Sequence, residues 1–207
     1  SVDLRSFIFL DSLQPQLTSY LCTIAKGYLP ITRDAAMLIE VSPGIAINRI
    51  TDVAVKRTAV RPAIQIVERA FGVLEYHHAS QAEVQEAGAQ VLQQIGLTED
   101  DQIKPEIKTS EIITQISDYQ AMLINRVRFG EMFLPGKTMY ILEVHPAGYA
   151  MFAANEAEKA SPVDLIDCRF SGAFGRLYLS GSEAEIEEAA KAVHQALDGV
   201  SGREAKS

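Results

Sequence analysis

A charged pair, Glu68-Arg69, interrupts a stretch of the chain that is otherwise apolar. Residues 63–67 precede it, Ala70-Phe71-Gly72 follows it, and residues 73–74 are apolar again. Short apolar runs on either side of a glycine-containing segment are typical of a strand, a turn and a second strand. On one exposed turn, such a pair is a surface salt bridge that contributes about 0–1 kcal/mol. In a symmetric oligomer with the turn near the axis, several copies would form a ring of charges.

The stretch recurs 103 positions later, where Ser171-Gly172 replaces the charged pair and Ala173-Phe174-Gly175 follows. An ungapped comparison of residues 37–74 with 140–177 gives ten identities in 38 positions. Chance would give roughly two or three at average residue usage. A period of this length suits two whole domains in tandem rather than a solenoid. We therefore expect one domain over residues 1–103 and a second over 104–207.

The remaining residues that could do chemistry do not form a constellation. His77 and His78 are adjacent, and neighbouring residues on a strand point to opposite faces, so the two cannot readily share a metal ion. His145 and His194 stand alone, and the sequence has no nucleophile motif or clustered acid pair. We expect no catalytic residues, no metal and no cofactor.

The composition is that of a soluble globular protein, with 47% hydrophobic and 22% charged residues among 207. A net charge of −8 and a pI near 5.0 argue against nucleic-acid binding. No apolar run approaches the roughly 20 residues that span a bilayer. The beginning shows no signal peptide, and Cys22 and Cys168 are not equivalent in the repeats. We expect a cytoplasmic protein without disulfides, and a disordered tail over residues 201–207.

Each repeat predicts the order strand, helix, strand, helix, strand, strand, helix, which is an α+β arrangement on a mainly antiparallel sheet. The prolines of Glu-Val-x-Pro, Pro43 and Pro146, should close the second strand of each repeat. Gly27 and Gly130 should stop the first helices. Capping boxes beginning at Ser80 and Ser182 should open the last helices.

Both repeats keep a lysine late in the second helix, Lys56 and Lys159. One interpretation is a solubilising surface charge. The other is a contact at the edge of an oligomer with a neighbouring oligomer.

Nearly the whole chain resembles tandem bacterial-microcompartment shell proteins, in particular the carboxysome subclass whose trimers carry a gated pore. The resemblance rests on segments in both repeats: LRSFIFLDSLQPQ (4–16), EVSPGI (40–45), VERAFG (67–72), LINR (123–126), PAGYA (146–150), AANEAEKA (153–160) and GAFGRL (172–177).

The resemblance implies two circularly permuted shell domains of ferredoxin-like build and a homotrimer that forms a pseudohexameric tile. Two tiles could stack around a chamber, and other shell hexamers would be lateral partners through Lys56 and Lys159. Glu68, Arg69, Ala70 and Phe71 match the pore gate. In the second repeat, Ser171, Gly172 and Ala173 match the pore position.

For function, the resemblance implies a structural shell protein of the carboxysome in the cytoplasm, with no enzymatic activity. Phosphorylated metabolites such as ribulose bisphosphate or 3-phosphoglycerate would cross its pore. The alternative is a trimeric regulator that senses a small anion and does not tile. The two differ at the edge, because a tile needs Lys56 and Lys159 exposed.

Overall fold

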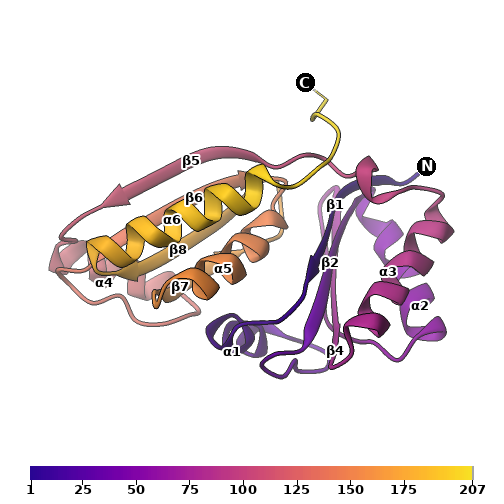
Figure 1. The fold of residues 1–207 in the computed structure, drawn as a ribbon, viewed down its shortest axis with the longest axis horizontal. Coiled ribbons are helices and arrows are strands. Elements are labelled where there is room, and N and C mark those ends of the chain that lie inside the picture. The colour runs from indigo at the N-terminus through magenta and orange to yellow at the C-terminus, as the bar shows by residue number, and fades with distance from the viewer. Residues whose placement is uncertain (207) are drawn as a thin grey trace. The chain divides into compact units, whose positions relative to one another are not determined.

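In the computed structural model, which describes residues 1–206, the chain folds as two copies of one strand-and-helix pattern (Figure 1). The first copy consists of β1 (Asp3–Leu10), α1 (Pro15–Ile24), β2 (Ala35–Ser42), α2 (Ile47–Arg57), β3 (Arg61–Glu68), β4 (Phe71–His78) and α3 (Gln81–Ile95). The second consists of β5 (Glu106–Ile113), α4 (Asp118–Val127), β6 (Thr138–His145), α5 (Tyr149–Ala160), β7 (Asp164–Arg169), β8 (Gly175–Gly181) and α6 (Glu183–Asp198). The predicted order of elements is confirmed in both.

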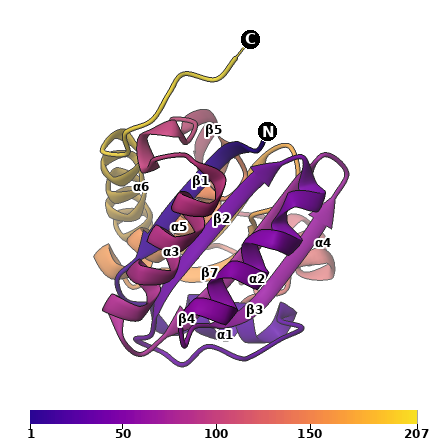
Figure 2. The ribbon, with the colours of Figure 1, turned by 90° about the vertical axis from the view of Figure 1, so that its right-hand side faces the viewer.

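Each copy contains one four-stranded sheet in which all neighbouring strands are antiparallel. The strand order is β1-β2-β4-β3 in the first and β5-β6-β8-β7 in the second. In the first sheet, α2 and α3 cover one face, as Figure 2 shows, and α1 lies on the opposite side (Figure 1). The α+β class with an antiparallel sheet is confirmed.

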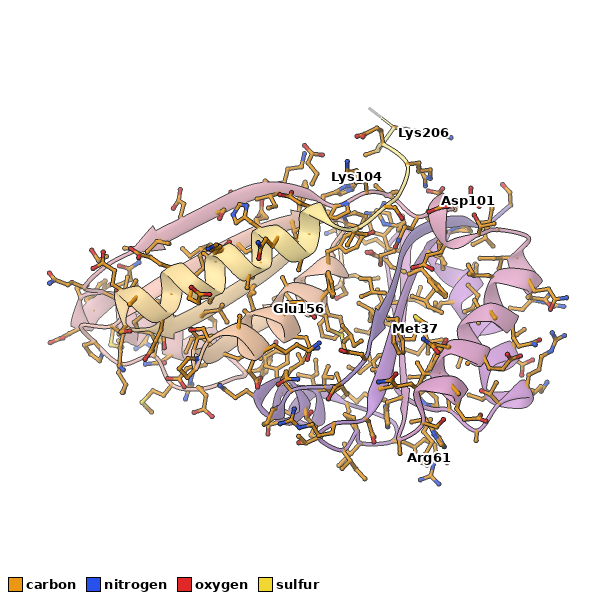
Figure 3. The ribbon with its side chains drawn as sticks, viewed as in Figure 1. Met37, Arg61, Asp101, Lys104, Glu156 and Lys206 are labelled. Carbon is orange, nitrogen blue, oxygen red and sulfur yellow. The ribbon has the colours of Figure 1, made fainter. Side chains whose placement is uncertain are left out.

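The first core lies between the sheet and the helices α2 and α3. Alternate residues of β2 face these helices, and Met37 (labelled in Figure 3) is 2% exposed there. From the helices, Ile50 and Val84 contribute to the same cluster. In the second copy, the alanines of α5 pack against α6 and the sheet of their own unit, and Ala153 and Ala157 are fully buried.

The backbone divides into two compact units. The first contains Ser1–Lys104 together with the end of the chain from Ser201, and the second contains Pro105–Val200. The Arg203 side chain donates to the carbonyl oxygen of Asp101 at 2.8 Å and bonds the Asp3 carboxylate. Backbone hydrogen bonds join Arg203 to Gln102 and Lys104. Figure 3 labels Asp101, Lys104 and Lys206 along this linker and tail. The expectation of a disordered tail is therefore wrong for residues 201–203, which these bonds hold in place, while Ser207 lies outside the described residues.

Gly27 and Gly130 do not act as the predicted helix stops, because α1 and α4 end at Ile24 and Val127. A Cβ on Gly27 would lie 2.4 Å from the carbonyl oxygen of Pro62, and one on Gly130 would lie 2.3 Å from that of Leu165. The glycines are needed where the chain runs against the edge strand. Their recurrence 103 apart reflects this close approach rather than a cap.

The capping box at Ser182 is complete, since its hydroxyl and amide both bond Glu185. The box at Ser80 is only half formed. Its hydroxyl accepts from the Glu83 amide, but the Glu83 carboxylate accepts from the backbone amide of Ala59, 3.0 Å away. This acidic side chain therefore joins α3 to the loop after α2.

Candidate functional site: the exposed hairpin of the first repeat

The hairpin between β3 and β4 presents the charged pair at its tip. Glu68 ends β3 and pairs with Phe71, the first residue of β4, so that Arg69 and Ala70 form a two-residue loop. Glu68, Arg69 and Ala70 are exposed, and Phe71 is half-buried. The predicted strand, turn and strand are confirmed, and all four residues lie together.

Arg69 has a left-handed backbone conformation, with φ of 53°. This region is unfavourable for residues with a Cβ by roughly 1–2 kcal/mol, and a two-residue hairpin loop usually places glycine there. Backbone strain of this kind is frequent at functional sites. Among the described non-glycine residues, Arg33 and Gln115 also have a positive φ, but Arg69 is the one at the tip of this hairpin.

A close backbone approach fixes the base of the hairpin. A Cβ on Gly72 would lie 2.3 Å from the carbonyl oxygen of Gly44, at the start of the segment that leads into α2. The second repeat has the same approach, because a Cβ on Gly175 would lie 2.3 Å from the carbonyl oxygen of Ala147. Both repeats therefore have the same close backbone contact at the base of the hairpin, and they differ at the tip.

The corresponding segment of the second repeat is a longer loop, residues 170–174, between β7 and β8. Ser171, Gly172 and Ala173 lie in this loop, and Gly172 also has positive φ, at 98°. No charged side chain is present at its tip. The two tips belong to separate compact units.

Two buried charged residues beneath the hairpin were not identified from the sequence. Arg5 lies 3.8 Å from the centre of the Phe71 ring, and its Nε is 3.6 Å from a carboxylate oxygen of Glu40. Glu40 has an identical counterpart, Glu143, whereas Arg5 has a lysine, Lys108. That combination of a retained acid and a changed base is the signal that could have revealed them.

The two lysines predicted for the edge lie apart from the hairpin, in the last turns of α2 and α5. Both residues are exposed. Lys56 pairs with Asp52 at 2.9 Å, and Lys159 pairs with Glu156 at 3.2 Å. The Lys56–Asp52 pair is exposed and therefore weak, so this ammonium group can exchange its carboxylate for another partner, whereas the side chains of Lys159 and Glu156 are each only 29% exposed.

The paired histidines have separate partners. His77 is buried, with Nδ1 3.1 Å from a carboxylate oxygen of Glu75, while Nδ1 of His78 accepts from the Ser80 amide at 2.9 Å. Burial raises the pKa of Glu75. Within residues 1–206, no group of three or more His, Cys, Asp or Glu could hold a metal ion.

Equivalent loops of the two repeats expose large apolar side chains, including Leu29 and Met132, and Ile31 and Leu134. In the second repeat, a cleft of about 410 Å³ adjoins this loop, between α4 and residues 132–135. Among the described residues, no helix is both long and apolar enough to cross a membrane.

Two antiparallel α+β units of the same build, joined in tandem, are the architecture expected of a tandem shell protein of bacterial microcompartments. The family model for the CsoS1D N-terminal domain matches residues 4–101. The chain is 50% identical over 203 residues to the carboxysome shell protein CcmP of Synechococcus elongatus, covering 98% of this chain and 95% of that one. It is 47% identical over 197 residues to the carboxysome shell protein CsoS1D of Hydrogenovibrio crunogenus, covering 95% and 96%. The chain belongs to this family of carboxysome shell proteins.

Solved structures agree with this assignment. A fused permuted hexameric shell protein from the RMM microcompartment is 48% identical, with a TM-score of 0.94, covering 98% of this chain and 100% of that chain. A double-ringed trimeric shell protein from the same microcompartment is 38% identical, with a TM-score of 0.95, covering 99% and 100%. The solved structures confirm the permuted tandem fold, and the carboxysome relatives confirm the structural rather than enzymatic role and the carboxysome location; both favour the shell protein over the sensor.

Proposed function

We propose that three chains assemble into a pseudohexameric tile, with residues 1–103 and 104–207 each supplying one shell domain, and that the β3–β4 hairpin gates its central pore. The observation that carries the gate is Arg69, an exposed arginine in a left-handed conformation at the hairpin tip. Three Glu68–Arg69 pairs around the axis would alternate with three uncharged loops formed by Ser171, Gly172 and Ala173.

The chemistry of the tip favours anions as cargo. When Arg69 and Glu68 of neighbouring chains pair, the opening is narrow and closed. When Arg69 turns toward the opening, it presents a guanidinium suited to phosphate groups. We propose phosphorylated metabolites, such as ribulose bisphosphate and 3-phosphoglycerate, as the cargo. Such a switch requires two states that differ by only a few kcal/mol.

Native mass spectrometry and electron cryomicroscopy test the assembly and the gate together. We expect a mass of three chains or a multiple of three, and two conformations of the hairpin in the wild-type protein. Glu68→Ala and Arg69→Ala should each remove the closed conformation, whereas Glu111→Ala, on an exposed strand position of the second unit, should not. A dimer or monomer would remove the three-fold axis, and a pore that stays closed in both tip variants would exclude this gate.

Lateral contact with other shell hexamers is proposed at Lys56 and Lys159, whose exposure supports this role. Lys56→Ala with Lys159→Ala should abolish two-dimensional sheets in electron micrographs while the mass of the tile stays unchanged. Lys108→Ala, a change of an exposed lysine on β5, serves as the matched control. Sheets that persist in the double variant would place the edge elsewhere.

Stacking of two tiles is proposed through the apolar loops after α1 and α4. Leu29 and Met132 are equivalent in the two repeats, as are Ile31 and Leu134. A tile of three chains, each with two repeats, would therefore present six such apolar loops on one face. A second copy of the same face can bury them all at once. Met132→Ser with Leu134→Ser should convert a six-chain species to three chains. Val55→Ser, at an exposed apolar residue of α2, should not.

A further inference from the structure

The hairpin of the first repeat rests on a buried arginine. Arg5 is 7% exposed, and its guanidinium carbon lies 3.8 Å from the centre of the Phe71 ring. This distance is within the range of a cation–π contact, which strengthens when the cation is removed from water. The planar guanidinium can stack on the ring, which an ammonium group cannot do.

A buried acid holds this arginine in place. Glu40 on β2 is fully buried, and one of its carboxylate oxygens lies 3.6 Å from the Arg5 Nε. The other oxygen accepts from the Ser6 hydroxyl at 3.1 Å. The ion pair therefore joins β1 to β2 directly below the ring that begins β4.

Fixing Phe71 fixes the start of the charged tip. Phe71 is the cross-strand partner of Glu68, and only Arg69 and Ala70 lie between them. On the other side of Phe71, Gly72 is locked against Gly44. Movement of the hairpin is thereby confined to the few residues beyond the Phe71 ring.

The second repeat shows that the fold does not need this arrangement. Lys108 replaces Arg5 and pairs with Glu106 at 2.7 Å, while Glu143 pairs instead with Arg176, at 3.2 Å. Phe174, the equivalent of Phe71, is 42% exposed and contacts the His145 ring at 5.9 Å between centroids. The same sheet forms without a buried arginine, and its tip carries no charged pair.

We propose that Arg5 is a positioning residue for the gate: it holds Phe71 by stacking, Glu40 anchors it, and the pair sets the resting conformation of Glu68 and Arg69. The proposal deepens the proposed function, since it assigns a control to the same hairpin. It also explains why the arginine is found only in the repeat whose tip carries charges.

Amide hydrogen exchange of the native assembly tests the proposal. Arg5→Lys keeps the charge and loses the stack, so exchange at residues 68–72 should accelerate by about tenfold, as expected for loss of a desolvated cation–π contact. Exchange in β2 and at residues 170–175 should not change. Lys108→Arg at the equivalent position of the second repeat is the control and should leave both tips unchanged.

Three outcomes decide the matter. Acceleration confined to residues 68–72 supports the proposal. Equal acceleration throughout β1, β2 and β4 would show that Arg5 only stabilises the sheet, and no acceleration would show that Phe71 is held without it; either overturns the proposal.

The double change Arg5→Met with Glu40→Gln removes both buried charges, and it should also loosen the tip if stacking matters. These exchange results stand even if Glu68→Ala and Arg69→Ala show that the hairpin does not gate a pore.

Discussion

Arg69 and Gly172 occupy equivalent positions 103 residues apart, and both have a positive φ, 53° for the arginine and 98° for the glycine. Glycine adopts this conformation without a steric penalty, whereas arginine does not. The two repeats thus share a backbone requirement and meet it with different residues. The first repeat retains a long cation at a position where the local backbone favours glycine.

Replacing Arg69 by glycine should therefore stabilise the protein even as it removes the charge from the tip. We expect the free energy of unfolding to rise by up to about 1 kcal/mol, because the strain of a left-handed arginine is relieved, although glycine also gains entropy in the unfolded chain. Urea unfolding followed by circular dichroism measures this. The reciprocal change, Gly172→Ala, should destabilise by a similar or larger amount, and a neutral result for both would show that neither loop is strained.

The close approach at the base of each hairpin predicts two equivalent defects. Gly72→Ala and Gly175→Ala would each place a Cβ 2.3 Å from a backbone carbonyl oxygen, so backbone must move. We expect each to lower the free energy of unfolding by about 2–4 kcal/mol. Gly199→Ala is the matched control, since its nearest atoms would be 3.5 Å away at an ordinary φ of −79°. Thermal unfolding distinguishes the pair from the control.

The ordered tail predicts a stabilising role for Arg203. Its side chain bonds the carbonyl oxygens of Leu4 and Asp101 and the Asp3 carboxylate. Arg203→Ala should cost about 1–2 kcal/mol, the range for partly exposed hydrogen bonds to a charged donor. Lys206→Ala removes an exposed cation from the same tail and should have no measurable effect in the same thermal unfolding experiment. Equal melting temperatures for all three proteins would contradict this role.

The buried acid Glu75 predicts a pH dependence of stability in the first unit. Desolvation raises the pKa of Glu75, while its bonds to His77 and to the Ala63 amide oppose that rise. The folded state therefore holds this proton more tightly than the unfolded state does. The raised pKa of Glu75 therefore adds to the free energy of unfolding. This added stability is complete below the ordinary glutamate pKa near 4.5, and it is lost as the pH rises through the pKa of Glu75 in the folded state.

Glu75→Gln should flatten this dependence, because a glutamine can still accept from the Ala63 amide but does not titrate. Urea unfolding between about pH 5 and pH 8 compares the slopes of the free energy of unfolding. Glu188→Gln changes an exposed carboxylate on α6 and should leave the slope of the wild type intact. A Glu75→Gln slope as steep as that of the wild type would assign the pH dependence to other groups.

Much of the fold was predictable because each sequence pattern that indicates a strand or a helix occurs twice, once in each repeat. Pro43 and Pro146 follow directly on β2 and β6, and apolar residues at helical spacing mark α3 and α6. The charged tip was also predictable, since Glu68 and Arg69 interrupt apolar residues on both sides. These features depend on local sequence, which is visible without knowledge of the tertiary structure.

The features that were not predicted depend on which segments meet in space. Gly27 satisfies the pattern of a helix stop, but its role comes from the carbonyl oxygen of Pro62, 35 residues away along the chain. Glu83 satisfies the pattern of a capping box, yet Ala59 competes for its carboxylate. Arg5, Glu40 and Phe71 lie on three strands, so their contact appears only once the sheet is formed. The contacts of Glu83 and Arg5 arise where the two copies differ, whereas the close approach of Gly27 recurs in the second copy at Gly130.

The tail contacts have a consequence for synthesis. The first unit takes residues from both ends of the chain, whereas the second is one continuous segment, Pro105–Val200. On the ribosome, which makes the chain from its N-terminus, the second unit can be completed while the first still lacks Arg203. The first unit can make its contacts with Arg203 only after residues 105–200 have been synthesised, so the half that carries the charged tip depends on a segment made after the whole second unit.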